Sequence, residues 1–132
     1  MLDTNAHDAV LGDADLHRAV AESVAAGKVV LVGTHVQDDE LRRAPVRIRG
    51  SLSTVAALAQ QIPTEGSVWD VSNWDQSTWT ATAGEQKLGE LMLCNPKHAV
   101  DVLIALTAEA KCDVLVTHDR RLSRKVRRSG SA

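Results

Sequence analysis

The chain has 132 residues, a formal net charge of -2 and an apolar content of 44%, so we expect one domain, residues 1–132, with a sizeable buried core. No apolar run approaches the roughly 20 residues of a membrane-spanning helix and nothing resembles a signal peptide, which predicts a cytoplasmic protein without membrane contact. Its two cysteines, Cys94 and Cys112, lack the spacing of a metal site or a disulfide framework, and we assign them no function.

The N-terminal segment predicts a β-α-β unit. Residues 1–3 read as a strand that ends at an acid. Asp13 or Asp15 can cap a helix that Gly27 ends, and residues 29–32 form a short apolar strand. We expect this helix to pack on a sheet through one apolar stripe, formed by Leu16, Val20 and Val24. The β-α-β order implies parallel strands and an α/β fold.

Two more helices are predicted before the middle of the chain. Thr34 opens the first and Pro45 bounds it, and Glu40 lies about two turns inside it. Ser51 or Ser53 begins the second.

The segment from residue 64 to residue 84 has a less regular pattern. Residues 68–71 suggest a short strand, and a polar, turn-rich stretch follows them. A helical pattern resumes over residues 85–93. The aromatic side chains of the whole chain are Trp69, Trp74 and Trp79, so these alone could stack on unpaired bases.

The stretch from Asn95 to Arg121 places two acids in unusual positions. Asn95 can cap a helix that carries Asp101 within an otherwise apolar run. Residues 112–117 then read as a buried strand, and Asp119 lies just beyond its carboxyl end. Open parallel sheets bind ligands at that end of their strands.

The predicted fold brings acids from four places to one rim. The carboxyl ends of parallel strands, and the helices that follow them, can bring together Asp3, Glu40, Asp101 and Asp119. Carboxylate oxygens suit Mg²⁺ or Mn²⁺, and four uncompensated carboxylates would repel one another without a cation. The pattern therefore indicates phosphate chemistry at a metal site.

A structural role for each acid is the alternative. Asp101 can pair with a nearby arginine, Glu40 can pair with Arg42 or Arg43, and Asp119 can cap a final helix.

Charge is segregated along the chain. Between Gly50 and Gln86 there is no Lys or Arg. Six of the fifteen basic residues lie near the C-terminus, at Arg120, Arg121, Arg124, Lys125, Arg127 and Arg128. Such a cluster predicts a surface that attracts a polyanion, or else a solvated terminal helix.

At its acids the sequence resembles the PIN-domain ribonucleases, which include toxins of bacterial toxin-antitoxin pairs. The matching words are Leu2-Asp-Thr-Asn5, Thr34-His-Val-Gln-Asp-Asp-Glu-Leu41, Asp101-Val-Leu-Ile-Ala and Val116-Thr-His-Asp119. The resemblance covers the N-terminal strand, the second helix and residues 95–122. It implies a single PIN-like domain, residues 1–132, in which a central, mostly parallel sheet is flanked by helices in three layers.

The resemblance also implies a site and a function. Catalytic and metal-binding roles fall on Asp3, Glu40, Asp101 and Asp119. Polar support is expected from Asn5 and Thr117, and RNA binding from Arg120, Arg121, Arg124 and Lys125. The implied activity is hydrolysis of RNA phosphodiester bonds with Mg²⁺ or Mn²⁺, and the implied partners are an antitoxin protein and a second copy of the chain.

Two features depart from the family pattern. Only Met1 and Leu2 precede the first acid, so we expect either a stunted strand that holds Asp3 loosely or a few missing upstream residues. His118 stands where the family often has Asn, and it can contact phosphate, substitute as a ligand or remain a surface side chain.

Functions from other classes fit less well. A phospho-accepting receiver domain needs a Lys after a late strand, and residues 114–119 offer none. An HD-type phosphohydrolase, suggested by His7-Asp8 and His118-Asp119, is all-helical, which the strand patterns oppose. A PIN-like protein that binds RNA or serves as a scaffold without cleaving RNA is the main alternative.

Overall fold

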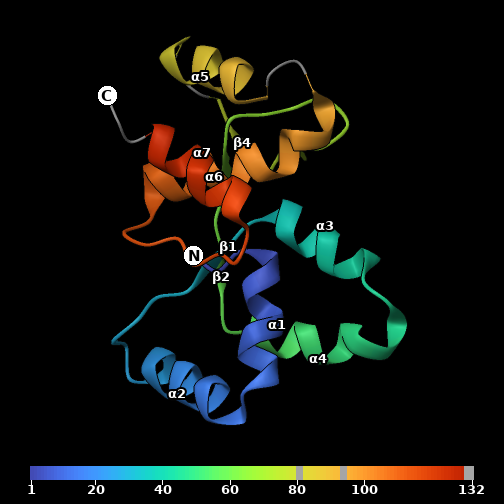
Figure 1. The fold of residues 1–132 in the computed structure, drawn as a ribbon, viewed down its shortest axis with the longest axis vertical. Helices are drawn as coiled ribbons and strands as arrows, with labels where there is room; N and C mark the ends of the chain where they lie inside the picture. The colour runs from blue at the N-terminus through green and yellow to red at the C-terminus, as the bar shows by residue number, and fades with distance from the viewer. Residues whose placement is uncertain (80–81, 93–94, 130–132) are drawn as a thin grey trace.

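The computed structural model describes residues 1–79, 82–92 and 95–129 of the chain (Figure 1). Its helices are α1 (Thr4–Gly12), α2 (Ala14–Ala25), α3 (His35–Arg43), α4 (Val46–Ala56), α5 (Thr82–Met92), the 3-10 helix η1 (Pro96–His98), α6 (Ala99–Lys111) and α7 (Arg120–Ser129). Its strands are β1 (Val32–Gly33), β2 (Gln60–Gln61), β3 (Thr64–Glu65) and β4 (Ser77–Thr78). The chain therefore mixes helices and strands.

The strands form two small parallel sheets. β1 pairs with β2, and β3 pairs with β4. One further parallel bridge joins Leu2 to Val116. The described residues thus contain parallel pairing, as the α/β prediction requires, but they do not form a central sheet with helices on both faces. None of the described helices combines the length and the apolar character that crossing a bilayer requires.

The core surrounds α6, which lies beside α7 in the upper half of Figure 1. Leu103 and Ile104 on this helix are fully buried. They form a cluster with Met1 and Leu122, from the two ends of the chain, and with Val36 of α3. Burying one such aliphatic side chain stabilises the fold by about 1.5–3 kcal/mol. Because the buried side chains of α6 cluster with residues from both ends of the chain, this helix joins the N-terminal and C-terminal segments.

Two predicted strands are wrong in their extent. Residues 29–32 contribute only Val32 to a strand, and Val30 is 61% exposed. Residues 112–117 form one bridge at Val116, and Val114 is 63% exposed. Strands need partners to bond their backbones, and the partner of Val116 is short because α1 begins at Thr4. The pairing stops where that helix starts.

The first amphipathic helix is confirmed, but its packing is not. Asp13 caps α2 by accepting from the backbone N–H groups of Asp15 and Leu16, and Gly27 follows its end with a φ of 69°. However, α2 buries none of its residues, and Leu16 is 42% exposed. The prediction that its apolar stripe packs on a sheet is wrong, because α2 lies against α1 instead.

Helix starts were predicted with mixed success. Thr34 opens α3 as expected, and its backbone N–H donates to Gln37 Oε1 at 3.0 Å. The prediction that Ser51 or Ser53 begins the next helix is wrong, because α4 begins straight after Pro45. Proline suits a helix start, whereas the Ser53 hydroxyl donates to a carbonyl inside the helix.

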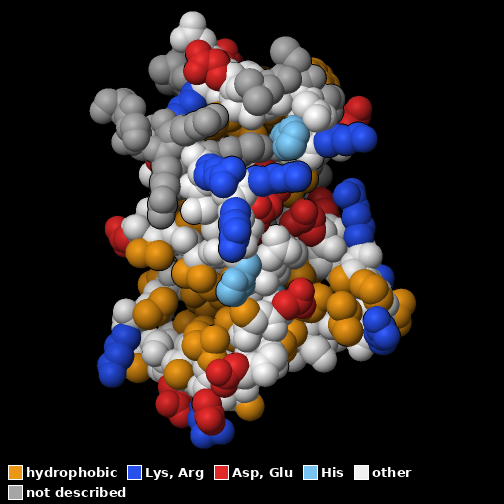
Figure 2. Space-filling view, in the orientation of Figure 1, with side chains coloured by type: hydrophobic (Ala, Val, Ile, Leu, Met, Phe, Trp, Pro, Cys, Tyr) orange, Lys and Arg blue, Asp and Glu red, His pale blue; other side chains and the backbone are white. Residues whose placement is uncertain are grey.

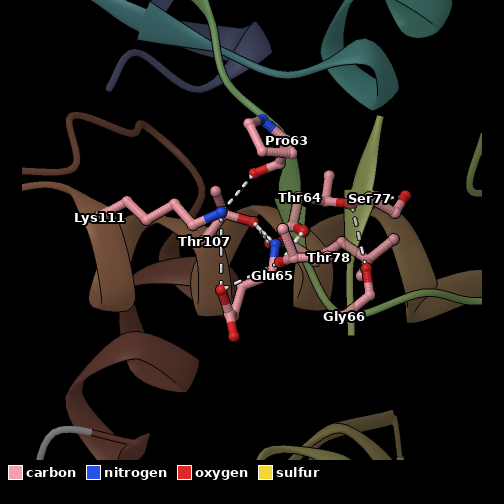
Figure 3. Close-up of polar contacts among 9 residues, drawn as sticks. Pro63, Thr64, Glu65, Gly66, Ser77, Thr78, Thr107 and Lys111 are labelled. Atoms are coloured by element: carbon pink, nitrogen blue, oxygen red, sulfur yellow. Dashed lines mark hydrogen bonds and ion pairs between the residues drawn. The ribbon is translucent and has the colours of Figure 1, made fainter. Parts of the chain in front are cut away.

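The second small sheet is held on α6 (Figure 3). Thr107 Oγ1 accepts from the backbone N–H of Glu65 at 2.9 Å and donates to the Leu103 carbonyl at 2.7 Å. Lys111 Nζ donates to the Pro63 carbonyl at 2.9 Å and lies 3.6 Å from a Glu65 carboxylate oxygen. These contacts fix β3, and through it β4, against the helix that carries Asp101.

The strand predicted at residues 68–71 is wrong. This segment forms a turn between β3 and β4, and Asp70 has a φ of 62°. A positive φ is sparsely populated outside glycine, although aspartate tolerates it better than most residues. The turn directs the chain back to pair β4 with β3.

The approach to α6 differs slightly from prediction. The helical pattern assigned to residues 85–93 begins earlier, at Thr82, and residue 93 lies outside the described residues. Asn95 Oδ1 accepts from the backbone N–H of Lys97, so it opens η1 and not α6. α6 itself starts at Ala99, which places Asp101 in its first turn.

Candidate active site

Asp3 lies at the junction of the two chain ends. It is 4% exposed and caps α1, with its Oδ1 accepting from the backbone N–H of Thr4 at 2.8 Å. Its Oδ2 accepts from the Thr117 hydroxyl at 2.7 Å, and its backbone N–H donates to the Val116 carbonyl at 2.9 Å. Asp3 is therefore firmly held, and the expectation that a short first strand would leave it loose is wrong.

Thr117 connects Asp3 with Asp119. While its hydroxyl donates to Asp3, its Oγ1 also accepts from the backbone N–H of Asp119 at 2.9 Å. Thr117 therefore orients the Asp3 carboxylate and, through the backbone of Asp119, the turn that carries Asp119. This is the geometry of the polar support predicted for Thr117.

Glu40 reaches the same region from α3. The Thr4 hydroxyl donates to its Oε2 at 2.5 Å. The start of α1 therefore contacts Glu40 through Thr4 and Thr117 through the capping Asp3. Gln37 on the same helix donates through Nε2 to the Leu2 carbonyl at 2.5 Å. These two bonds fasten α3 to the N-terminal segment.

The electrostatics of Glu40 bring Asp101 into this group. Burial raises the pKa of Glu40 above its ordinary value of 4.5, the hydrogen bond from Thr4 lowers it, and the charges of Asp3 and Asp101 raise it again. Arg43 opposes them with a smaller lowering effect on this pKa. Asp3, Glu40 and Asp101 therefore lie close enough together for the charges of Asp3 and Asp101 to influence the ionisation of Glu40.

A cavity of about 370 Å³ gives Glu40 access to solvent. Val36, Glu40 and Arg43 line one part of it, and Asp70 and Asn73 line another. A substrate that enters this cavity would contact both a carboxylate and a guanidinium group.

Asp119 has a structural contact of its own. Its Oδ1 accepts from the backbone N–H groups of Arg121 at 2.6 Å and Leu122 at 3.4 Å, so it caps α7, as the structural alternative predicted. Its side chain is half-buried and also lines a shallow cavity of about 260 Å³. The cap uses one carboxylate oxygen, so it does not exclude a second role for the other oxygen at this cavity.

Basic side chains border this cavity. Its lining includes exposed His118, Arg120 and Arg124 beside Thr117 and Asp119. Figure 2 shows Lys and Arg side chains gathered at the middle of this face, over α7, with acidic side chains recessed beside them. Such a border can attract a polyanion toward acids that would otherwise repel it.

The remaining predicted residues lie at the edge of the site or outside its description. Asn5 is exposed on α1 and takes no part in the bonds among Asp3, Glu40 and Thr117. Arg121 is exposed on α7, and the side chain of Lys125 lies outside the described part of the structure.

The ion pair proposed between Glu40 and Arg42 is not found, because Arg42 Nη1 lies 3.6 Å from Asp39 Oδ1 instead. Sequence reasoning missed Thr4 and Gln37, which hold Glu40 and its helix. Gln37 had a signal, since it stands three residues after the capping Thr34.

The donor chemistry of the site suits a hard cation, but its arrangement is incomplete. Asp3, Glu40 and Asp101 supply carboxylate oxygens, and after burial the charges of Asp3 and Asp101 also raise the pKa of Glu40. Within residues 1–79, 82–92 and 95–129, no three His, Cys, Asp or Glu side chains are grouped so that they could hold a metal ion. Thr4 and Thr117 each hydrogen-bond one oxygen of Glu40 and Asp3, which orients these carboxylates and leaves further lone pairs on them.

Comparison of the chain with protein-family models, curated proteins and solved structures found no match. The likeness to PIN-domain ribonucleases therefore rests on the motif residues of the sequence alone.

Proposed function

We propose that the chain is a Mg²⁺- or Mn²⁺-dependent ribonuclease with its active site at Asp3, Glu40 and Asp101, beside Asp119. The observation that carries this proposal is the meeting of α1, α3 and α6, where burial first, and then the charges of Asp3 and Asp101, raise the pKa of Glu40. Acids that are at least partly buried and repel one another are costly to a fold, and they occur preferentially where function requires them.

Each protein group has a role in this proposal. A bound cation would orient the scissile phosphate and lower the pKa of an attacking water. Asp3, Glu40 and Asp101 would hold the cation, and Thr4 and Thr117 would position two of these carboxylates. Arg43 and Arg120 would draw the RNA backbone toward them.

The finer features follow from the same resemblance. We propose a cytoplasmic location, an antitoxin protein as inhibitor and a homodimer as the working state. Single-stranded or looped RNA is the proposed substrate, because an unpaired backbone can enter an acidic site that basic side chains border.

A direct assay tests the activity. Purified chain would be incubated with mixed RNA in Mg²⁺, in Mn²⁺ and in EDTA, and the cut ends would be sequenced. We expect cleavage with either metal and none in EDTA. Binding without cleavage under all three conditions would favour the second candidate, a PIN-like RNA-binding or scaffold protein, for which the basic border around Asp119 is the supporting observation.

The basic border should contribute affinity without sequence preference. Replacing Arg120 and Arg124 by Ser should weaken RNA binding and lower the log–log salt slope by roughly 0.7 for each phosphate that is no longer neutralised. The cleavage positions should not change, because phosphate contacts carry no base information. Fluorescence anisotropy with labelled single-stranded RNA in EDTA, at several salt concentrations, measures the affinity and the slope.

The matched control for this experiment is Arg47→Ser, which removes an exposed arginine from α4. A double variant with the wild-type salt slope would show that α7 does not contact the RNA backbone.

A further inference from the structure

Trp69, Trp74 and Trp79 form an exposed tryptophan cluster. Their exposed fractions are 81%, 75% and 77%. The ring centroids of Trp69 and Trp74 lie 5.7 Å apart at 78°, and those of Trp74 and Trp79 lie 6.3 Å apart at 56°. Single apolar side chains on a surface need no explanation, but a contiguous group of the largest ones marks a binding surface.

The backbone holds the tryptophan cluster in place. Trp69 and Trp74 lie in the connection between β3 and β4, and Trp79 follows β4 directly. Inside the connection, the Ser72 hydroxyl accepts from the backbone N–H of Val68 at 3.0 Å. The rings are thus carried by a segment whose base is fixed on α6 through Thr107 and Lys111 (Figure 3).

A second tie links the cluster to the helix of Glu40. The backbone N–H of Asn73 donates to Nε2 of the buried His35, the first residue of α3, at 3.2 Å. The segment that displays the rings is therefore joined to both α6 and α3. These two helices carry Asp101 and Glu40.

A cavity of about 440 Å³ lies at the tryptophan cluster. Besides the three rings, its lining includes the polar residues Asp70, Ser72 and Asn73. The same three residues line the cavity of about 370 Å³ that contains Glu40. The two cavities therefore adjoin, with these residues as their shared wall.

We propose that the tryptophan cluster binds an unpaired base of single-stranded RNA next to the phosphodiester bond that is cleaved. Every nucleobase presents a flat π face that stacks on an aromatic ring, and Asp70 and Asn73 supply polar atoms for base edges. Gly50 to Gln86 contains no Lys or Arg, so this surface suits a neutral base and not a phosphate. The inference rests on the proposed ribonuclease function and adds a base-binding subsite to it.

Intrinsic fluorescence gives a selective test. The chain has three Trp and no Tyr, and all three Trp lie in the cluster, so its emission reports on this site alone. In EDTA, where the proposed nuclease is inactive, single-stranded oligoadenylate should quench the emission. The same oligoadenylate paired with oligouridylate should not, because base pairing holds its bases inside the duplex, where they cannot splay out onto a ring. Adenosine and its monophosphate should quench alike, since the lining of this cavity has no cation for the phosphate.

Variants measure the contribution of the rings. Trp74→Ala should weaken the binding of labelled oligoadenylate at least about fivefold, measured by anisotropy in EDTA, whereas Trp74→Phe should retain most of the affinity. Val46→Ala is the matched control, because Val46 is comparably exposed, at 81%, and lies on α4. Melting curves check that each variant folds.

The outcomes separate this inference from the proposed function. Quenching by oligoadenylate without RNA cleavage in Mg²⁺ or Mn²⁺ would support the base-binding site and contradict the ribonuclease. RNA cleavage without quenching, and with Trp74→Ala at wild-type affinity, would overturn the base-binding site alone. Quenching by tetramethylammonium but not by oligoadenylate would also overturn it, in favour of an organic-cation site.

Discussion

Asp101→Asn should lower RNA cleavage at least about a hundredfold, the scale expected when a positioned catalytic group or its metal is lost. The change removes one charge and keeps the size of the side chain. Asp101 lies in the first turn of α6, and its charge acts on Glu40. Initial rates of cleavage of a single-stranded RNA in Mn²⁺, with protein of verified folding, measure the effect.

Asp119→Asn distinguishes a cap from a catalytic group. Asparagine caps helices about as well as aspartate, so α7 should persist in this variant. A similar loss of cleavage would assign Asp119 to the active site, whereas full activity would leave it as the cap of α7. Asp8→Asn is the control, because Asp8 is exposed on α1. If Asp101→Asn cleaved RNA at the wild-type rate, the proposed site would be wrong.

Glu40→Gln should raise the melting temperature by a few degrees in EDTA near neutral pH while abolishing cleavage. Burial and the charges of Asp3 and Asp101 disfavour the ionised form of Glu40. The amide of glutamine carries no charge, and its oxygen can still accept from Thr4. The variant therefore loses the repulsion and keeps the hydrogen bond.

The pH dependence of this effect has a defined sign. The pKa of Glu40 is raised in the folded state, so between 4.5 and that raised value the folded chain binds more protons than the unfolded chain. The contribution of Glu40 to the free energy of unfolding is thus fully present below pH 4.5, and it is lost as pH rises through the folded pKa. The melting temperature of Glu40→Gln minus that of wild type should therefore grow with pH across this interval.

Metal addition completes the test. Mn²⁺ should raise the melting temperature of wild type more than that of Glu40→Gln, because a ligand that binds only the folded state stabilises it. Glu22→Gln on α2 is the control, since it removes the same charge from a helix that buries none of its residues. A Glu40→Gln protein that melts below wild type in EDTA, with no Mn²⁺ shift in either, would make Glu40 a structural residue held by Thr4.

Local sequence signals located some helix ends correctly. Asp13 and Asp119 cap helices at the positions that the sequence indicated, and Thr34 opens α3. These assignments succeed because a cap depends on one side chain and the backbone N–H groups of the next three residues. The choice of Asp3, Glu40 and Asp101 also came from the order of short motifs, and their catalytic role remains a prediction.

Tertiary contacts determined the rest. The β-branched runs at residues 29–32 and 112–117 have the composition of buried strands, yet most of their length is unpaired because strands depend on partners distant in sequence. The placement of the tryptophan cluster likewise follows from the Glu65–Thr107 and Asn73–His35 hydrogen bonds. The partners in these bonds are 42 and 38 residues apart in sequence. Cap residues act on their own helix. Other features exist only once the chain has folded and brought distant segments together: strand pairing, the Thr4–Glu40 and Thr117–Asp3 bonds, and the repulsion around Glu40.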